Sequence, residues 1–362
     1  MKYILNMNER PVYLQLYKYL RGDIIRGVYP FETKLPSKRL LADELGVSTI
    51  TVEHAYALLC DEGYTEARER SGYFVIFSSS DGFASAESGA EAASAKPIMP
   101  AGEHPVFSVS ILCKTMRKIL TDRRDDMLSR SPNKGLADLR NSLRLYLARN
   151  RGITVSAEQI VIGSGAEYLY GFIVQLLGRD KIYAIESPSY EKIEQVYRAA
   201  GVSYESLPLS DDGIDSSALS HSHADVLHTT PYRSYPSGVT ASASKRHEYI
   251  HWSECGERYI VESDYDSEFS VSSRPAETLF ALAEKENVIY LNTFSKTISP
   301  SLRVGYMVLP ESLVARFDER LGFYSCSVPT FEQLVLTELI NSGDFERHIN
   351  RVRRLKRREM NG

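Results

Sequence analysis

Tryptophan occurs once and cysteine four times in this chain of 362 residues. Because the four cysteines form no C-x-x-C pair and no metal-ligand spacing, the sequence predicts reduced, mostly buried thiols. No apolar run approaches the roughly 20 residues of a membrane-spanning helix. We also expect no secretory leader, because the first residues do not show its pattern. From these absences we expect a cytoplasmic protein.

Positive charge is not in excess either, since 43 Lys and Arg residues face 47 Asp and Glu residues and the formal net charge is −4. Any contact with nucleic acid must therefore come from a local surface. His221, His223 and His228 lie near one another, but no cysteine or carboxylate pattern completes a metal site around them. They are interpreted as loop and strand residues.

The first part of the chain carries three helical patterns. Apolar residues recur at helical spacing from Pro11 to Arg26. Ser37 is a typical N-cap for a second helix, and Gly46 marks a tight turn after it. Ser48 is a typical N-cap for a third helix over residues 49–61. A helix, a short glycine-containing turn and a further helix predict a helix-turn-helix.

A hairpin and then a linker follow these helices. Residues 65–70 and 73–77 predict two strands around a Ser-Gly turn, so residues 9–77 are expected to form a winged helix-turn-helix. Ten basic residues balance ten acidic ones over residues 1–77, which predicts a modest, salt-sensitive affinity for DNA. Residues 78–96 are rich in Ala, Ser, Glu and Gly without periodic apolar positions, which is typical of a flexible linker.

Helices and strands are expected to alternate over residues 97–362. The predicted order is helices at 112–120 and 136–149, a strand at 159–162, a helix at 166–177, and strands at 181–185, 226–228, 259–261 and 288–291, with helical stretches between the last of them. This alternation implies an α/β domain with a mostly parallel sheet and helices on both faces.

A lysine lies in a hydroxyl-rich turn after the last of these strands. The string Asn-Thr-Phe-Ser-Lys-Thr occupies residues 292–297, and Arg303 follows it. A lysine amine such as that of Lys296 can form a Schiff base with pyridoxal phosphate (PLP). The hydroxyls of Thr293 and Ser295 and the guanidinium of Arg303 suit a phosphate dianion. Alone, this string is equally consistent with a surface lysine after a buried strand.

An acidic cluster that contains a tyrosine favours the cofactor interpretation. Asp264 and Tyr265 lie in Glu-Ser-Asp-Tyr-Asp, residues 262–266, directly after a predicted strand. A carboxylate can keep a pyridine nitrogen protonated, and a tyrosine hydroxyl can bond the ring oxygen. Gly163-Ser164-Gly165 lies between a strand and a helix, where backbone N–H groups can hold phosphate. By itself this turn is weak evidence, because an ordinary strand-to-helix turn looks the same.

Together these segments resemble fold-type I aminotransferases, and most closely the MocR subfamily of GntR-type transcriptional regulators. The GntR winged helix is matched by Leu35-Pro36-Ser37-x-Arg39, Leu41-Ala42-x-x-Leu45-Gly46-Val47-Ser48, Thr51-Val52, Ala55-Tyr56, Glu62-Gly63-Tyr64 and Ser71-Gly72-Tyr73-Phe74-Val75. The similarity covers nearly the whole chain. It implies a winged helix-turn-helix joined to a PLP-dependent transferase-like large domain, with operator DNA as partner, PLP as cofactor and a homodimer as assembly.

The resemblance also implies site residues. Those for DNA binding are Ser37, Arg39, Ser48, Thr49, Thr51, His54, Arg68, Arg70 and Gly72. Those for the cofactor are Gly163, Ser164, Gly165, Tyr190, Asp264, Tyr265, Thr293, Ser295, Lys296 and Arg303, with Lys296 as the catalytic lysine. Tyr190 matches the aromatic residue that stacks on the pyridine ring in the family.

Several positions depart from the family pattern. Ser263 stands where relatives carry the ring-nitrogen carboxylate, so either a bulge lets Asp264 take its place or the cofactor is a weaker electron sink. Glu167 stands where many relatives carry an amide, Thr49 where they carry an arginine, and Tyr232-Arg233 where they carry Ser-His.

The end of the sequence departs from the family as well. The chain stops just after an arginine-rich run, residues 347–358, which is interpreted as an exposed helix rather than a nucleic-acid-binding tail. Family members continue into a small C-terminal domain that grips a substrate carboxylate, and we expect that domain to be missing here.

The sequence therefore predicts a PLP-dependent, ligand-sensing regulator of the GntR/MocR type, with a small amine or amino acid as effector. We expect the aminotransferase-like domain to serve sensing more than turnover. Two alternatives stay open. One is an active aminotransferase with an accessory DNA-binding domain, and the other is a truncated DNA-binding protein with a vestigial cofactor domain.

Overall fold

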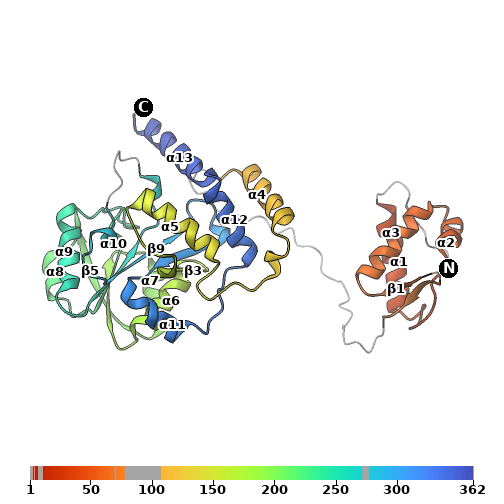
Figure 1. Cartoon of the computed structure of the whole chain (residues 1–362), viewed down its shortest axis with the longest axis horizontal. Coiled ribbons are helices and arrows are strands. Elements are labelled where there is room, and N and C mark those ends of the chain that lie inside the picture. The colour runs from red at the N-terminus through yellow and green to blue at the C-terminus, as the bar shows by residue number, and fades with distance from the viewer. Residues whose placement is uncertain are drawn as a thin grey trace. The chain divides into compact units, whose positions relative to one another are not determined.

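The structure is a computed structural model that describes Tyr3 and residues 5–6, 11–69, 71–77, 107–270 and 277–361. The chain divides into two compact units, Met1–Met99 and Pro100–Gly362 (Figure 1). The linker expected at residues 78–96 and the wing residue Arg70 lie outside the described residues.

The first unit contains three helices and a two-stranded hairpin. The elements are α1 (Val12–Ile25), α2 (Lys38–Leu45), α3 (Thr49–Asp61), β1 (Thr65–Arg68) and β2 (Gly72–Val75). The Ser37 side chain accepts a hydrogen bond from the Leu40 N–H, and the Ser48 side chain accepts one from the Thr51 N–H. Both predicted N-caps are confirmed. Gly46 ends α2 with φ 64°, a left-handed conformation that a residue with a Cβ adopts only at a cost.

One core holds this unit together. It is formed by apolar side chains that recur at helical spacing on α1 and α3, among them Leu16, Leu20, Val52, Tyr56 and Leu59. The antiparallel hairpin adds Val75, which is paired with Thr65. The Tyr56 hydroxyl donates to the Pro36 carbonyl oxygen at 2.8 Å, so the third helix is tied to the start of the second.

The second unit is built on an eight-stranded sheet. Its strands are β3 (Ile160–Gly163), β4 (Ile182–Ser187), β5 (Ser203–Ser210), β6 (Gly213–Ile214), β7 (Val226–Thr229), β8 (Tyr259–Ser263), β9 (Val288–Thr293) and β10 (Gly305–Val308). They are arranged in the order β3-β10-β9-β8-β7-β4-β5-β6. The pairs from β9 to β5 are parallel, whereas β10 is antiparallel to both neighbours and β6 is antiparallel to β5. The predicted, mostly parallel sheet is confirmed.

Helices cover both faces of this sheet (Figure 1). The helices of this unit are α4 (Val109–Asp122), α5 (Ala137–Arg151), α6 (Ala166–Leu177), α7 (Glu191–Ala200), α8 (Ser216–His221), α9 (Ala243–Glu254), α10 (Leu279–Leu282), α11 (Glu311–Leu321), α12 (Thr330–Asn341) and α13 (Asp344–Asn361). Short 3-10 turns are η1 (Asp126–Leu128), η2 (Ala157–Gln159), η3 (Ser267–Phe269) and η4 (Pro300–Leu302).

Successive side chains of the strands enter different cores, as the two-residue period of a strand requires. On β9, Ile289 and Leu291 pack with α6, α7 and α11, whereas Tyr290 packs with α5 and α12 on the other face. The alternation continues on β8, where Val261 lies on the α6 face and Ile260 on the opposite face. This alternation decides which site residues can meet.

The cysteine prediction is wrong in one respect. All four cysteines are free, but Cys255 is exposed and Cys60, Cys113 and Cys326 are only partly buried. Cys255 directly follows the last residue of α9, where the helix end faces solvent, and the other three lie outside the buried part of the cores.

Candidate functional site

The predicted cofactor residues gather at one edge of the sheet. Parallel strands end at the same edge, and β3, β4, β8 and β9 lead there into the segments that carry Gly165, Tyr190, Tyr265 and Lys296. Arg303 reaches the same edge because β10 runs in the opposite direction and begins two residues after it. Open α/β sheets bind ligands at this edge.

Lys296 lies against Asp266 and Tyr265. Its Nζ is 2.6 Å from Oδ1 of Asp266, whose side chain is buried, and it lies over the Tyr265 ring at 4.6 Å from the centroid. Asp266 also pairs with Arg233 at 3.4 Å. Burial, and then the charge of Asp266, raise the pKa of Tyr265 to about 12. The Tyr265 hydroxyl is therefore a hydrogen-bond donor at neutral pH.

A second cluster forms around Gly165, where β3 leads into α6. Gly165 has φ 99°, a backbone conformation that favours glycine, and a Cβ placed on it would lie 2.6 Å from Nη2 of Arg303, so the guanidinium would have to shift. Arg303 Nη2 donates to Glu167 at 2.6 Å, and Lys192 Nζ donates to the other carboxylate oxygen of Glu167 at 2.9 Å. The N–H of Ser164 donates to the Ser327 hydroxyl at 3.2 Å.

Ser263 faces α6 and a buried histidine. His228 Nε2 is 2.8 Å from the Ser263 hydroxyl, and the Tyr197 hydroxyl is 2.7 Å from His228 Nδ1. The Tyr170 hydroxyl lies 3.3 Å from Ser263 on the other side. Burial lowers the pKa of His228 to about 3, so the imidazole is neutral. A hydroxyl and a neutral ring therefore stand where the family pattern has a carboxylate.

Asp264 points to the opposite face of β8. Its carboxylate forms a buried ion pair with Arg151 of α5 and accepts a hydrogen bond from the Tyr290 hydroxyl at 2.8 Å. Ser263 keeps its regular register opposite Leu291, and the Asp264 N–H donates to the Leu291 carbonyl oxygen, so the described strand has no bulge here. The geometry gives Asp264 a partner other than a ring nitrogen, and its assignment to the cofactor stays a prediction.

The remaining predicted cofactor residues lie around these clusters. Thr293 ends β9, and Ser295 is partly buried beside Lys296. Tyr190 is 37% exposed, with Tyr235 at 6.3 Å and Lys192 over its ring at 5.9 Å. An aromatic face with this much exposure can accept a planar ring.

The loop from Thr230 to Gly238 is fixed by a buried glutamate. Glu186 accepts hydrogen bonds from the hydroxyls of Thr229 and Ser234 and from the Thr230 N–H. Burial raises the pKa of Glu186, although these donors oppose the shift. The loop carries Arg233, whose φ of 49° is unusual for a residue with a Cβ and places its side chain near Asp266.

The sequence did not point to Asp266 or Arg151 as site residues. It also did not predict that Glu167 forms ion pairs or that His228 contacts Ser263. Asp266 had a signal, because it follows Tyr265 in the same acidic string. The contacts of Arg151, Glu167 and His228 have no signal in the sequence, because they join segments that are far apart along the chain. The donor set as a whole fits PLP, because a lysine, a phenol, hydroxyls and a guanidinium beside a glycine turn converge on one edge.

In the first unit, the predicted DNA-binding residues lie on the exposed side of α2 and α3. Ser37, Arg39, Ser48, Thr49 and His54 are exposed, and Thr51 is partly buried. The Ser48 and Thr51 hydroxyls lie 2.8 Å apart. Lys38 pairs with Glu53 at 2.7 Å across the two helices, which offsets the negative charge of Glu53.

The wing carries one arginine in a fixed position. Arg68 donates to Glu66 at 2.5 Å and lies over the Phe74 ring at 4.5 Å. Gly72 begins β2 with φ 116°, and a Cβ there would lie 3.0 Å from the Lys34 side chain. Helix N-termini, hydroxyls and arginines on one surface are suitable donors to DNA phosphates.

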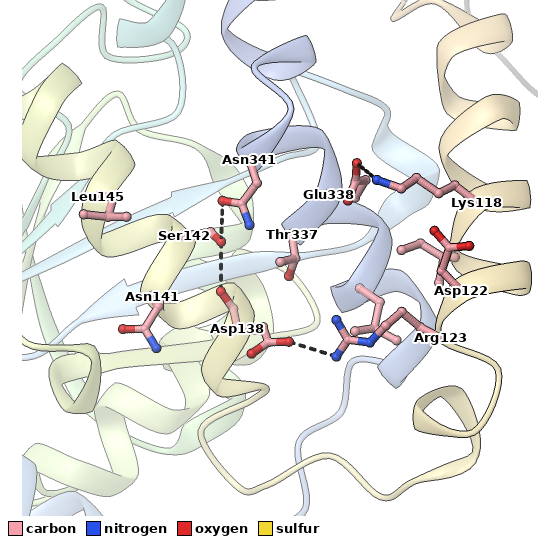
Figure 2. A pocket seen from close by; sticks show the side chains of 12 residues that line it. Lys118, Asp122, Arg123, Asp138, Asn141, Ser142, Leu145, Thr337, Glu338 and Asn341 are labelled. Atoms are coloured by element: carbon pink, nitrogen blue, oxygen red, sulfur yellow. Dashed lines mark hydrogen bonds and ion pairs between the residues drawn. The ribbon is translucent and has the colours of Figure 1, made fainter.

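A separate cavity of about 480 Å³ lies between α4, α5 and α12 (Figure 2). Lys118 and Glu338 pair at 2.6 Å on one side of it, and Arg123 and Asp138 pair at 2.9 Å on the other. None of its lining residues belongs to the Lys296 site. No helix in the described part of the chain is long and apolar enough to cross a membrane.

Two family models match this chain. Residues 12–75 match the bacterial regulatory proteins of the gntR family, and residues 108–361 match aminotransferase class I and II. The second match alone covers more than half of the chain. It agrees with the sheet and the Lys296 edge described above.

Curated relatives carry both parts. The HTH-type transcriptional regulator YdeL of Bacillus subtilis is 31% identical in an alignment of 363 positions that covers 96% of this chain and 77% of that protein. The probable rhizopine catabolism regulatory protein MocR of Rhizobium meliloti is 28% identical over 95% of this chain and 75% of its own length. The pyridoxine biosynthesis regulator PdxR of Corynebacterium glutamicum is 28% identical over 95% of this chain and 76% of its own length.

Solved structures resemble the second unit. The kynurenine aminotransferase of Pyrococcus horikoshii shares 27% identity at a TM-score of 0.62, over 70% of this chain and 66% of that chain. The α-aminoadipate aminotransferase LysN of Thermus thermophilus shares 26% identity at a TM-score of 0.61, over 70% of this chain and 66% of that chain. With a gntR helix-turn-helix, a class I and II aminotransferase domain and relatives that join the two in this order, the chain belongs to the MocR-type GntR transcriptional regulators.

Proposed function

We propose that this regulator binds operator DNA with its winged helix, holds PLP on Lys296, and responds to a small amine or amino acid that displaces the lysine. One observation carries the proposal. Lys296 with Tyr265, and Arg303 with Gly165, lie at the same sheet edge of a chain whose other unit is a GntR winged helix. The effector and the cofactor are inferences from this donor set.

Each group has a separate role in holding the cofactor. Arg303, the Gly165 turn and the hydroxyls of Thr293 and Ser295 are suited to the phosphate, and the Tyr265 hydroxyl to the ring oxygen. Tyr190 offers an exposed aromatic face for the ring. Bound PLP supplies an aldehyde that condenses with amines and a ring that draws electrons from the bonded carbon.

The Asp266 carboxylate can bind the Lys296 ammonium after an amine has displaced the lysine from the cofactor. When an amine takes its position, the Lys296 ammonium can return to the Asp266 carboxylate, where it lies at 2.6 Å in the structure. Asp266 also contacts Arg233, whose loop is held by Glu186. A change at Lys296 is thus passed to the surface through one carboxylate and one loop.

The surroundings of Ser263 favour sensing over turnover. A carboxylate at the ring nitrogen keeps the ring protonated and stabilises a carbanion, whereas a serine hydroxyl is neutral and supplies no charge that would keep the nitrogen protonated. The neutral His228 behind Ser263 supplies no negative charge either. We therefore expect amines to bind and exchange with slow conversion to keto acids.

Three further features complete the proposal. We propose a homodimer, as the family resemblance implies, and the cytoplasm as the compartment, since operator DNA lies there. We also propose that residues 9–77 and 97–362 are the functional domains, joined by the linker at 78–96. Mass photometry and limited proteolysis test the assembly and the boundaries.

The DNA-binding part is tested by selection. The full chain is used to enrich duplexes from a random pool, and fluorescence anisotropy then compares the selected duplex with a shuffled one. Preference for the selected duplex, with weaker binding to both duplexes in Arg39→Ala, supports the proposal. Equal binding to both duplexes contradicts it.

The sensing part is tested on the same duplex. The protein is loaded with PLP and titrated with a panel of amino acids and simple amines, and Lys296→Ala is the matched variant. We expect at least one amine to change the DNA affinity of the unaltered protein and none to change that of the variant. Sustained keto-acid production at every amine concentration would instead support the aminotransferase alternative.

A further inference from the structure

Glu167 lies where an anion would be bound. It is in the first turn of α6, immediately after the Gly163-Ser164-Gly165 turn. One carboxylate oxygen accepts a hydrogen bond from Arg303 Nη2 at 2.6 Å, and the other accepts one from Lys192 Nζ at 2.9 Å. The two cations come from different parts of the chain, the segment before β10 and the first turn of α7.

The helix N-terminus adds to this arrangement. A Cβ on Gly165 would lie 2.6 Å from Arg303 and 3.4 Å from the Glu167 carboxylate, so both charged groups lie against the same glycine. Backbone N–H groups at the start of a helix favour a negative charge there. Glu167 thus has an arginine, a lysine and a helix N-terminus around one carboxylate.

The carboxylate is charged at every pH at which the protein is expected to work. Burial alone would raise the pKa of Glu167, but the hydrogen bonds from Lys192 and Arg303 outweigh it and lower the pKa to about 2. A group ionised down to that pH presents the same negative charge at pH 6 and at pH 8. Competition with another anion therefore does not depend on pH through this residue.

We propose that Glu167 is an internal competitor for the cofactor phosphate. The proposal rests on the proposed function, because it concerns the phosphate end of the same site. A phosphate dianion matches the two positive charges of Arg303 and Lys192, whereas a phosphate beside an undisplaced Glu167 leaves an excess of negative charge. The phosphate must take over the Arg303 donor and push the Glu167 side chain away.

Release of Glu167 has a consequence for Tyr190. Lys192 lies over the Tyr190 ring at 5.9 Å while it holds Glu167. Because one lysine contacts both residues, displacing the carboxylate also changes the surroundings of the ring expected to cover the cofactor. The competitor makes the cofactor exchangeable, so the protein responds to the free concentration of PLP as well as to amines.

The test compares Glu167→Gln with the unaltered full chain. Glutamine keeps the size of the side chain but removes its charge, and Glu167→Ala is a second variant in case the first folds poorly. Glu338→Gln is the matched control, because Glu338 is also paired with a lysine, Lys118, but lies at the other cavity. Each protein is titrated with PLP, with pyridoxal and with inorganic phosphate.

The three ligands separate the possible results. Absorbance reports PLP and pyridoxal on Lys296, and the thermal midpoint reports phosphate without any need for the lysine. We expect the Kd of PLP to fall about tenfold in both Glu167 variants, because one charge that opposes a dianion is removed from a partly exposed site. The Kd of pyridoxal, which lacks the phosphate, should stay unchanged, and phosphate should stabilise the variants more than the unaltered protein.

Two results would overturn the inference. Equal PLP affinity in all proteins, with a clear absorbance band, would refute the competition and leave the cofactor proposal standing. A parallel gain for pyridoxal would mean that Glu167 acts on the ring and not on the phosphate. Absence of a band in every protein would refute the cofactor proposal, and the phosphate titration would then decide the anion site by itself.

Discussion

Replacing Arg151 by methionine removes the cation that lies among three buried carboxyl groups. Arg151 pairs with Asp264, and both side chains are nearly inaccessible at 5% and 4% exposure. Glu262 and Glu268 are buried nearby, and the charge of Asp264 acts on both of them. Methionine fills similar space, so the change tests charge more than volume.

The expected loss is large. Leaving a buried charge without its partner typically costs about 3 to 5 kcal/mol of unfolding free energy. Arg149→Met is the matched control on the same helix, because Arg149 pairs with Glu346 while its side chain is 54% exposed. Surface pairs of this kind contribute about 1 kcal/mol or less.

The pH dependence follows from the two glutamates. Burial, and then the charge of Asp264, raise the pKa of Glu262 and of Glu268 to about 7, and Arg151 opposes both shifts. A carboxyl whose folded pKa is above its unfolded value holds its proton more tightly in the folded state, so its contribution to stability is lost as pH rises through the folded pKa. Without Arg151 both folded pKa values rise further. The difference in unfolding free energy between the unaltered protein and the less stable Arg151→Met should therefore grow from pH 6 to pH 8.

The assay is urea unfolding followed by tryptophan fluorescence. The single tryptophan, Trp252, is buried in α9, so the signal reports the aminotransferase-like unit even in the full chain. A loss in Arg151→Met no greater than in Arg149→Met would refute the reasoning. If this difference in unfolding free energy shrinks between pH 6 and pH 8, Arg151 does not lower the pKa values of Glu262 and Glu268 as argued.

Three further outcomes are expected. Gly165→Ala should lower stability by about 1 kcal/mol, because φ 99° is strained for a residue with a Cβ, and it should raise the Kd of PLP, because that Cβ would displace the Arg303 guanidinium; an unchanged PLP titration would contradict this. Ser263→Asp should increase the rate of keto-acid formation from added amino acids by about tenfold or more, measured in single-turnover mixing, and a rate within twofold would count against the role given to Ser263. Arg39→Ala should reduce the slope of log affinity for DNA against log salt by about 1, whereas Lys18→Ala on α1 should leave it unchanged.

Most of the fold could be predicted from local signals. The third helix begins and ends as predicted because Ser48 caps it and its apolar residues recur at helical spacing. The predicted strands at 259–261 and 288–291 correspond to β8 and β9 because each is a buried apolar run. In contrast, β5, β6 and β10 were not predicted. Only one residue of β5 is buried, and the strand mixes polar with apolar residues. β10 has only four residues.

The site could be predicted only in part. Lys296, Tyr265 and Gly165 lie at one edge because the strands before them end there, which the predicted order of elements already implies. The place of Arg303 was not implied, because it depends on the unpredicted antiparallel strand β10. The partners of their neighbours could not be deduced. Arg151 reaches Asp264 from 113 residues away, and Glu167 reaches Arg303 from 136 residues away. Such pairs depend on which face of a strand or helix each side chain occupies, and this emerges only when the elements pack.

The most direct test of the account is a PLP titration of the full chain followed by visible absorbance, with borohydride reduction and peptide mapping. Lys296→Ala is the test variant, and Lys285→Ala, which removes an exposed lysine, is the control. The account predicts a saturable band in the unaltered protein and in Lys285→Ala, none in Lys296→Ala, and a reduced adduct on the peptide that contains Lys296. A protein without a band, or a band that persists in Lys296→Ala, would contradict the central claim.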